Sequence, residues 1–150
     1  MSIERIDFAK VAPAAMQPFY SVEKYLGQCP LEPNLVELVK LRASQINGCG
    51  YCLDMHTKAA RQNGENEQRL DVLNGWREVN LYSSRERAAL AWTESLTLLS
   101  NNNVPDEVYE PLEKNFSETE IVDLTVLIAQ INSWNRLAIA LRKPLPVDAT

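Results

Sequence analysis

Two cysteines and a histidine lie at a spacing that suits redox chemistry. Cys49, Cys52 and His56 stand at positions i, i+3 and i+7, and residues at these offsets share one face of a helix. Cys49 follows the turn signal Asn47-Gly48, so a helix N-terminus would stabilise its thiolate and lower its pKa. His56, one turn beyond Cys52, could hold the proton of that thiol. The pattern predicts that one thiolate attacks a substrate and the other closes a disulfide.

Three other interpretations of these residues stay open. The thiols could be small buried apolar groups of the core. They could belong to a structural zinc site, whose ligands would be Cys29, Cys49, Cys52 and His56. A zinc knuckle usually places its cysteine pair in a tight turn, and a chain of 150 residues folds without a metal. A thioredoxin-like site would need a strand before Cys49, and none is predicted. Cys29 precedes Pro30 in an expected loop and is predicted to be a partly buried free thiol.

The elements that must position these side chains are all predicted to be helices. Glycine is scarce, with five residues, and no alternating apolar and polar run reaches the length of a strand. Capping boxes at Ser83–Glu86 and Ser117–Glu120 indicate two helix starts. The expected helices span about residues 13–26, 34–46, 49–62, 67–73, 84–99, 106–115 and 121–141. We therefore predict an all-α fold, a single-domain helical bundle of about seven helices over residues 1–150.

Composition excludes several classes of function. The formal net charge is -5 and the sequence pI is about 4.9, which argues against binding to nucleic acid because such proteins carry a basic patch. No secretory signal and no membrane-spanning run is evident. Three cysteines without a signal fit a reducing compartment. We expect a cytoplasmic protein that binds neither nucleic acid nor membrane.

The residues around the cysteine pair resemble those of a known family. Residues 37–64 are similar to AhpD-like alkylhydroperoxidases of the carboxymuconolactone decarboxylase superfamily. The pattern in that family is a glutamate twelve residues before the first cysteine, followed by C-x-x-C-x-x-x-H. Glu37, Cys49, Cys52 and His56 meet it here. The resemblance extends over residues 65–73 and 86–97, about two-thirds of the chain in all.

The resemblance implies a fold, an activity and a role for each residue. Cys52 would be the thiol that attacks the peroxide, and Cys49 would resolve the resulting sulfenic acid to a disulfide. His56 would activate Cys52, while Glu37 would orient the imidazole. The family is all-α and oligomeric, so a homo-oligomer, a trimer or a hexamer, is expected. The partners would be a hydroperoxide and an external dithiol or redox protein, with no cofactor and no metal.

One residue departs from the family pattern. The best-known peroxidase branch has a second histidine immediately before the second cysteine, and Tyr51 stands there in this chain. A phenol has an ordinary pKa of about 10 and is a poor proton shuttle near neutral pH. The alternatives are a non-enzymatic zinc-binding or redox-sensing module and a carboxymuconolactone decarboxylase-like enzyme. The decarboxylase branch generally lacks the cysteine pair.

Overall fold

The computed structural model describes residues 3–148, and every regular element in that range is a helix, which confirms the all-α fold class. The range contains nine α-helices and one 3₁₀-helix, η1, rather than about seven helices. Their bounds are α1 Phe8–Val11, α2 Pro13–Leu26, α3 Pro33–Asn47, α4 Gly50–Gln62, α5 Glu67–Asp71, η1 Leu73–Gly75, α6 Ser84–Thr97, α7 Leu99–Asn102, α8 Asp106–Asn115 and α9 Glu118–Leu141. The excess comes from α1 and α7, which have four residues each, too few for a helical period to be visible in the sequence.

Most helix bounds agree with the sequence prediction. Both α2 and α8 have the predicted bounds, although each contains an internal proline, Pro18 and Pro111. The two predicted capping boxes are present, with Ser83 and Ser117 each accepting a backbone hydrogen bond while Glu86 and Glu120 accept one in return. The expected helix 67–73 is divided into α5 and η1, and the expected helix 84–99 ends at Thr97.

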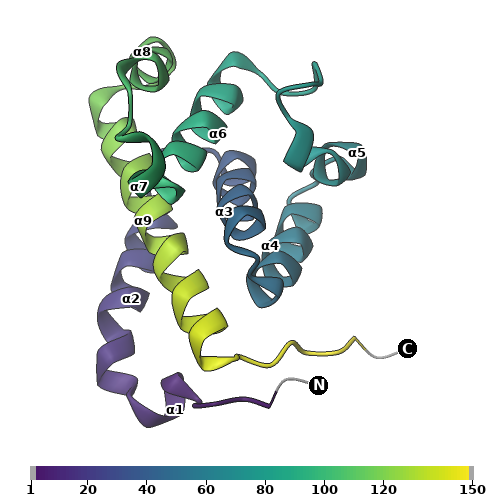
Figure 1. The fold of residues 1–150 in the computed structure, drawn as a ribbon, viewed down its shortest axis with the longest axis vertical. Helices are drawn as coiled ribbons and strands as arrows, with labels where there is room; N and C mark the ends of the chain where they lie inside the picture. Colours follow the sequence, from purple (N-terminus) through teal and green to yellow (C-terminus); the bar gives the residue numbers. More distant parts are fainter. Residues whose placement is uncertain (1–2, 149–150) are drawn as a thin grey trace.

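The longest helix, α9, lies at the centre of the packing. Figure 1 shows it running along the molecule between α2 on one side and α3 and α6 on the other. Leu124, Leu127 and Ile128 of α9 are almost fully buried in a core cluster with residues of α3 and α6. A second cluster joins α3, α4 and η1 with the loop that precedes α6. Because α3 belongs to both clusters, its position relative to α4 and α9 is fixed from two sides.

A left-handed glycine sets the turn between α3 and α4. Gly48 has a φ of 70° at the C-terminus of α3, a conformation that glycine adopts without the steric cost paid by other residues. The backbone N–H of Cys49 then donates to Ser44 O at 3.0 Å. The turn therefore places Cys49 directly at the start of α4.

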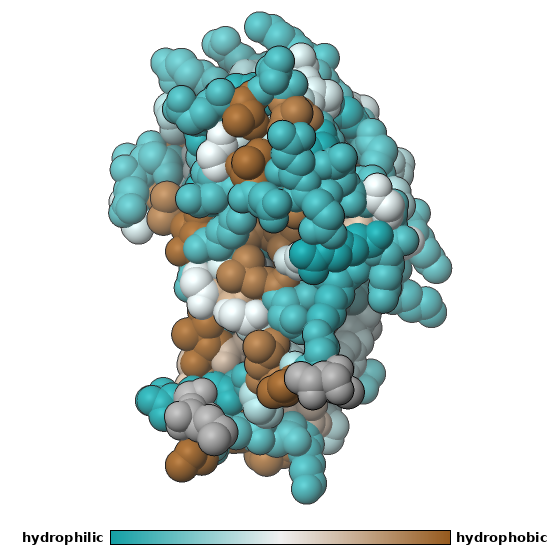
Figure 2. All heavy atoms as spheres, turned by 90° about the vertical axis from the view of Figure 1, so that its right-hand side faces the viewer, coloured by the Kyte–Doolittle hydropathy of each residue, from teal (hydrophilic) through white to brown (hydrophobic). Residues whose placement is uncertain are grey.

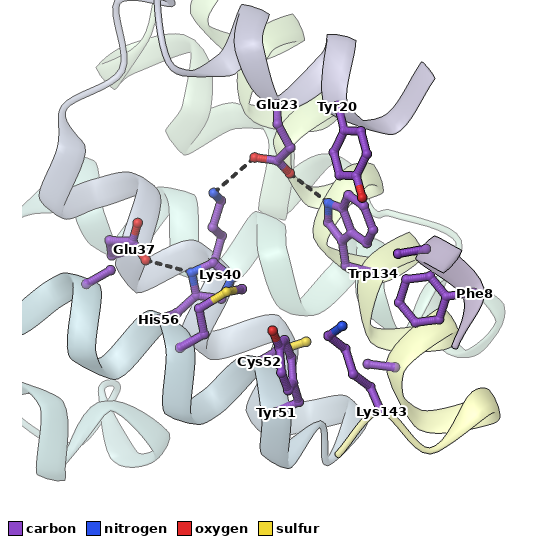
Figure 3. Close-up of a pocket in the computed structure, with 14 residues that line it drawn as sticks. Phe8, Tyr20, Glu23, Glu37, Lys40, Tyr51, Cys52, His56, Trp134 and Lys143 are labelled. Atoms are coloured by element: carbon purple, nitrogen blue, oxygen red, sulfur yellow. Dashed lines mark hydrogen bonds and ion pairs between the residues drawn. The ribbon is translucent and has the colours of Figure 1, made fainter. Parts of the chain in front are cut away.

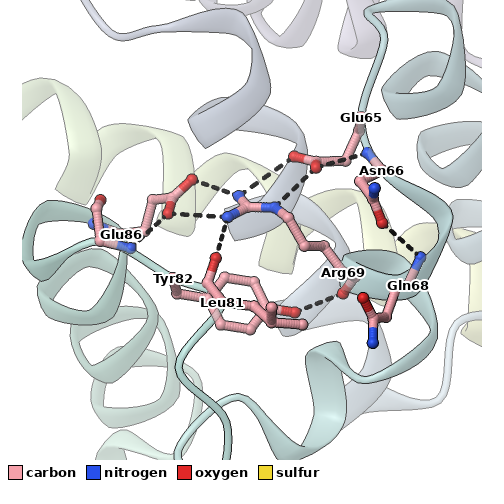
Figure 4. Close-up of polar contacts among 8 residues, drawn as sticks. Glu65, Asn66, Gln68, Arg69, Leu81, Tyr82 and Glu86 are labelled. Carbon is pink, nitrogen blue, oxygen red and sulfur yellow. Dashed lines mark hydrogen bonds and ion pairs between the residues drawn. The ribbon is translucent and has the colours of Figure 1, made fainter.

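An arginine joins the segment after α4 to α6. The Arg69 guanidinium is paired with Glu65 (N–O 2.8 Å) and Glu86 (N–O 2.5 Å) and also donates to Leu81 O. The Tyr82 hydroxyl donates to Arg69 O, and the Tyr82 ring lies 4.8 Å from the guanidinium carbon. Figure 4 shows Arg69 at the centre of these contacts. They hold α5 and the following loop against the first turn of α6.

The surface mixes hydrophilic and apolar side chains. In Figure 2, apolar side chains emerge between hydrophilic ones down the length of the visible face, including the region near the chain ends. Large apolar residues at least two-fifths exposed include Ile3, Tyr25, Met55, Leu99, Val122 and Val147. Among residues 3–148, none of the helices has both the length and the apolar character needed to cross a bilayer.

Candidate redox site

The two motif cysteines are in contact at the start of α4. Cys49 is the N-cap residue, and its sulfur accepts a hydrogen bond from the backbone N–H of Cys52 at 3.4 Å. The two Sγ atoms are 2.6 Å apart, so one thiol donates to the other. Both side chains are buried, each being 1% exposed. A small movement would bring the sulfurs to the bonding distance of a disulfide, about 2.05 Å.

The hydrogen bond between the two thiols and the start of α4 give Cys49 and Cys52 different pKa values. The pKa of Cys49 is lowered to about 7, chiefly by the hydrogen bond from Cys52 and against the effect of burial, with help from the Cys52 backbone N–H. The pKa of Cys52 is raised because its hydrogen is bound to Cys49, because it is buried, and because the Cys49 thiolate lies beside it. Above pH 7 the pair therefore carries one negative charge, mainly on Cys49.

Glu37 and His56, which are nineteen residues apart, meet across the α3–α4 contact. His56 Nδ1 donates to Glu37 Oε2 at 2.8 Å, and both side chains are largely buried. A carboxylate on Nδ1 fixes the tautomer and the orientation of the imidazole. It leaves Nε2 as the nitrogen that can accept a proton. Figure 3 shows the pair at one side of a pocket that also contains Cys52.

That pocket is a cavity of about 470 Å³ between α1, α2, α3, α4 and α9. Its lining includes three of the four predicted site residues: Glu37, Cys52 and His56. Cys49 is not part of the lining. Of the two thiols, Cys52 therefore faces the cavity, and Cys49 lies behind it as the neighbouring thiol.

Sequence reasoning missed Asn135, a fully buried residue of α9. Its side-chain hydrogen bonding lowers the pKa of both thiols. The amide is held in place because Asn135 Nδ2 donates to Ser44 Oγ at 3.1 Å and Oδ1 accepts from Asn47 Nδ2 at 2.9 Å. One sequence signal could have identified it: Asn135 is a polar residue within the long apolar run after Ile121. A buried amide there must have hydrogen-bond partners in the fold.

Cys29 does not join the motif residues. Its thiol donates to Leu26 O at 3.1 Å, and the side chain is partly buried against the core of α2, α3 and α9. Within residues 3–148, no three histidine, cysteine, aspartate or glutamate side chains converge in a way that could hold a metal ion. The four-ligand zinc set is therefore not assembled in the described part of the chain.

Tyr51 lies in the wall of the same cavity, at the position where a second histidine was expected from the family pattern. The Lys143 ammonium lies 5.0 Å from the centroid of the Tyr51 ring. Tyr51 therefore presents an aromatic face to a cation.

Comparisons with known proteins place the chain in a family. The model of the carboxymuconolactone decarboxylase family matches residues 12–95, more than half of the chain. The uncharacterised protein YdfG of Bacillus subtilis is 44% identical over 138 residues, which are 92% of this chain and 94% of that protein.

Solved structures share the fold. A protein of unknown function from Agrobacterium tumefaciens, for which an AhpD-type antioxidant role has been suggested, has a TM-score of 0.94 and 41% identity over 97% of this chain and 100% of its own. An uncharacterised peroxidase-related protein from Silicibacter has a TM-score of 0.77 and 25% identity, covering 88% and 70% of the two chains. The chain belongs to the carboxymuconolactone decarboxylase family and is an AhpD-like member of it.

Proposed function

We propose that the protein is a thiol-dependent peroxidase that reduces hydroperoxides through Cys49 and Cys52. The observation that carries the proposal is the arrangement of three groups: Cys52 lines a cavity, His56 lines it too, and the Cys49 sulfur lies 2.6 Å from that of Cys52. A nucleophile, a base and a resolving thiol are the groups that such a reaction needs. The suggested antioxidant role of the Agrobacterium protein favours the same activity.

The first step would use Cys52 and His56. As His56 Nε2 takes the thiol proton, the Cys52 sulfur attacks the terminal, hydrogen-bearing oxygen of the hydroperoxide and the O–O bond breaks. The leaving alkoxide takes the proton from His56 and departs as the alcohol, which leaves Cys52 as a sulfenic acid. Glu37 stabilises the imidazolium that forms in between, because its carboxylate is bound to Nδ1.

The second step would use the ionised Cys49. Its thiolate attacks the Cys52 sulfur, the S–O bond breaks, and the hydroxide leaves as water with a proton from solvent. In the reduced pair Cys49 has a pKa of about 7, so part of it is already a thiolate at neutral pH before Cys52 is oxidised. The sum is one hydroperoxide and two thiols converted to an alcohol, water and a disulfide. An external dithiol or redox protein would then reduce the disulfide, as a cytoplasmic location would permit.

Trapping the sulfenic acid in single mutants tests these roles. Cys52→Ser should lose the reaction with peroxide. Cys49→Ser should react once and stop as a Cys52 sulfenic acid, which a dimedone-type probe and peptide mass spectrometry would identify. Cys29→Ser serves as the control and should turn over like the parent. An adduct on Cys49 in Cys52→Ser, with none on Cys52 in Cys49→Ser, would reverse the assignment.

Metal content and turnover distinguish the peroxidase from the zinc or redox-sensing alternative. Protein purified under reducing conditions should contain far less than one zinc per chain and should consume hydroperoxide repeatedly when a dithiol is supplied. Stoichiometric zinc that is lost together with the fold on chelation would contradict the peroxidase. Release of carbon dioxide from a carboxymuconolactone, retained in a Cys49→Ser/Cys52→Ser double mutant, would favour the decarboxylase instead.

We further propose that the chain forms a homo-oligomer, a trimer or a hexamer. Val122 of α9 is 60% exposed and Leu99 of α7 is 53% exposed, and apolar side chains of this kind are usual in subunit interfaces. Light scattering should give a mass several times that of the 17.0 kDa chain. A stable monomer at micromolar concentration would contradict this.

A further inference from the structure

The cavity beside Cys52 is larger and more apolar than hydrogen peroxide requires. Its volume of about 470 Å³ lies in the range of sites for organic ligands. Aromatic and other apolar side chains make up most of the wall: Phe8, Tyr20, Tyr51, Met55, Trp134 and Ala138. Such a wall favours a hydrocarbon group on the substrate, because burying apolar surface releases it from water.

Four charged side chains also line the cavity, and three of them are paired within it. Glu37 is bound to His56. Glu23 is 3.5 Å from Lys40 Nζ and also accepts from Trp134 Nε1 at 2.8 Å. The Glu23–Lys40 pair cancels one negative and one positive charge of the wall, and the Glu37 carboxylate is occupied by the Nδ1–H of His56.

The fourth charged group, Lys143, has no carboxylate within 4 Å among residues 3–148. Its ammonium lies 5.1 Å from the Phe8 ring centroid and 5.0 Å from that of Tyr51. Figure 3 shows Lys143 beside Tyr51 and Phe8 on the side of the pocket away from Glu37. A half-buried cation between aromatic rings is partly desolvated and has its charge available to an anion.

The chain direction after α9 fixes this position. Arg142 adopts a left-handed conformation (φ 53°) at the end of α9. The backbone N–H of Lys143 then donates to Ala138 O at 2.9 Å. Because Ala138 itself lines the cavity, this bond holds Lys143 at the wall rather than on a free tail.

We infer that the cavity binds an organic carboxylate, with the carboxylate on Lys143 and the hydrocarbon against the aromatic wall. The identity of the substrate rests on the proposed peroxidase function. With that function, the substrate is an amphipathic hydroperoxide that carries a carboxylate at the end remote from its O–O group. Tyr51, which stands where the family pattern has a second histidine, holds its ring against the Lys143 ammonium. The role of Tyr51 is then to select the substrate by helping to position Lys143.

Binding of unreactive analogues tests the inference separately from turnover. The probes are para-isopropylbenzoate and its neutral counterpart para-isopropylbenzamide, titrated calorimetrically into the reduced full-length protein. The benzoate should bind at least about tenfold more tightly than the amide. Lys143→Met should abolish that difference, and Lys143→Arg should retain most of it. Lys114→Met, which removes the same charge from the exposed surface of α8, should leave the difference intact.

A second arm measures turnover of cumene hydroperoxide and its para-carboxylate. The ratio of their kcat/KM values should favour the carboxylate and should fall about tenfold in Lys143→Met. Equal binding of benzoate and amide, or a preference that survives Lys143→Met, overturns the inference. If the benzoate binds through Lys143 while neither hydroperoxide is consumed, the carboxylate site stands and the peroxidase proposal fails.

Discussion

Cys49 is the N-cap of the helix that carries Cys52, and the two sulfurs are 2.6 Å apart. The thiol with the lowered pKa is therefore the one behind the cavity, while the thiol that faces the cavity keeps its proton. A peroxidase can use this asymmetry. In the proposed reaction Cys52 would need a base only when peroxide is present, and Cys49 would be partly ionised at neutral pH before the peroxide arrives.

The ionisation of Cys49 should be visible in the fully reduced protein. Below pH 7 the thiol is protonated and above pH 7 it is a thiolate, so ultraviolet thiolate absorbance should rise with a midpoint of about 7. Cys52→Ala removes the principal hydrogen bond and should shift the midpoint toward an ordinary thiol pKa of about 8.5. Cys29→Ser should not move the midpoint. An unshifted midpoint in Cys52→Ala would show that the helix start alone acidifies Cys49.

Replacement of His56 should slow the first step by about 10²–10⁴-fold near neutral pH, the usual contribution of a general base. Little recovery is expected at higher pH, because the raised pKa of Cys52 keeps its thiol protonated beside the Cys49 thiolate. Glu37→Gln should cause a smaller loss, since the amide still accepts from Nδ1 but no longer stabilises the imidazolium. Single-turnover kinetics would measure both. The matched control is Glu110→Gln, which makes the same change at an exposed position of α8. Equal rates in Glu37→Gln and the parent protein would contradict the role of Glu37.

Asn135→Leu should raise the pKa of Cys49, because the amide hydrogen bonding that favours the thiolate is lost. It should also cost about 1–3 kcal/mol of stability, since Asn47 and Ser44 lose a partner in a buried site. Asn132→Leu, also on α9, is the comparison. It too loses a bond to Asn47, together with bonds to Thr97 and Arg136, but it is not among the groups that shift the pKa of either thiol. Thiolate titration and thermal unfolding of both variants separate the electrostatic effect from the structural one.

Removal of the Arg69 guanidinium should destabilise the fold. Its side chain is one-fifth exposed and binds two carboxylates and a carbonyl, so Arg69→Gln should lower the free energy of unfolding by about 2–3 kcal/mol. Arg61→Gln breaks an exposed pair with Glu67 and should leave the free energy of unfolding nearly unchanged, because water and salt screen such pairs. Urea unfolding would compare them. Similar losses in the two variants would mean that Arg69 does not hold α5 to α6.

Local sequence signals determined the helices well. The bounds of α2 and α8 and both capping boxes could be predicted, because helical period, caps and turns depend on neighbours in the chain. The cysteine pair at the start of α4 was predictable for the same reason. By contrast, α1 and α7 have four residues each, which is too few for a helical period to be recognised in the sequence.

Contacts between distant segments were decided only by the tertiary structure. From the residues alone, Glu37 was an ordinary helix-face carboxylate; packing of α3 on α4 brings it to His56. Asn135 and Lys143 come from the end of the chain, yet they lie beside the thiols and in the wall of the cavity. A spacing of three or four residues fixes which side chains share a helix face. The approach of one helix to another depends on the burial of the whole core, which no short motif contains.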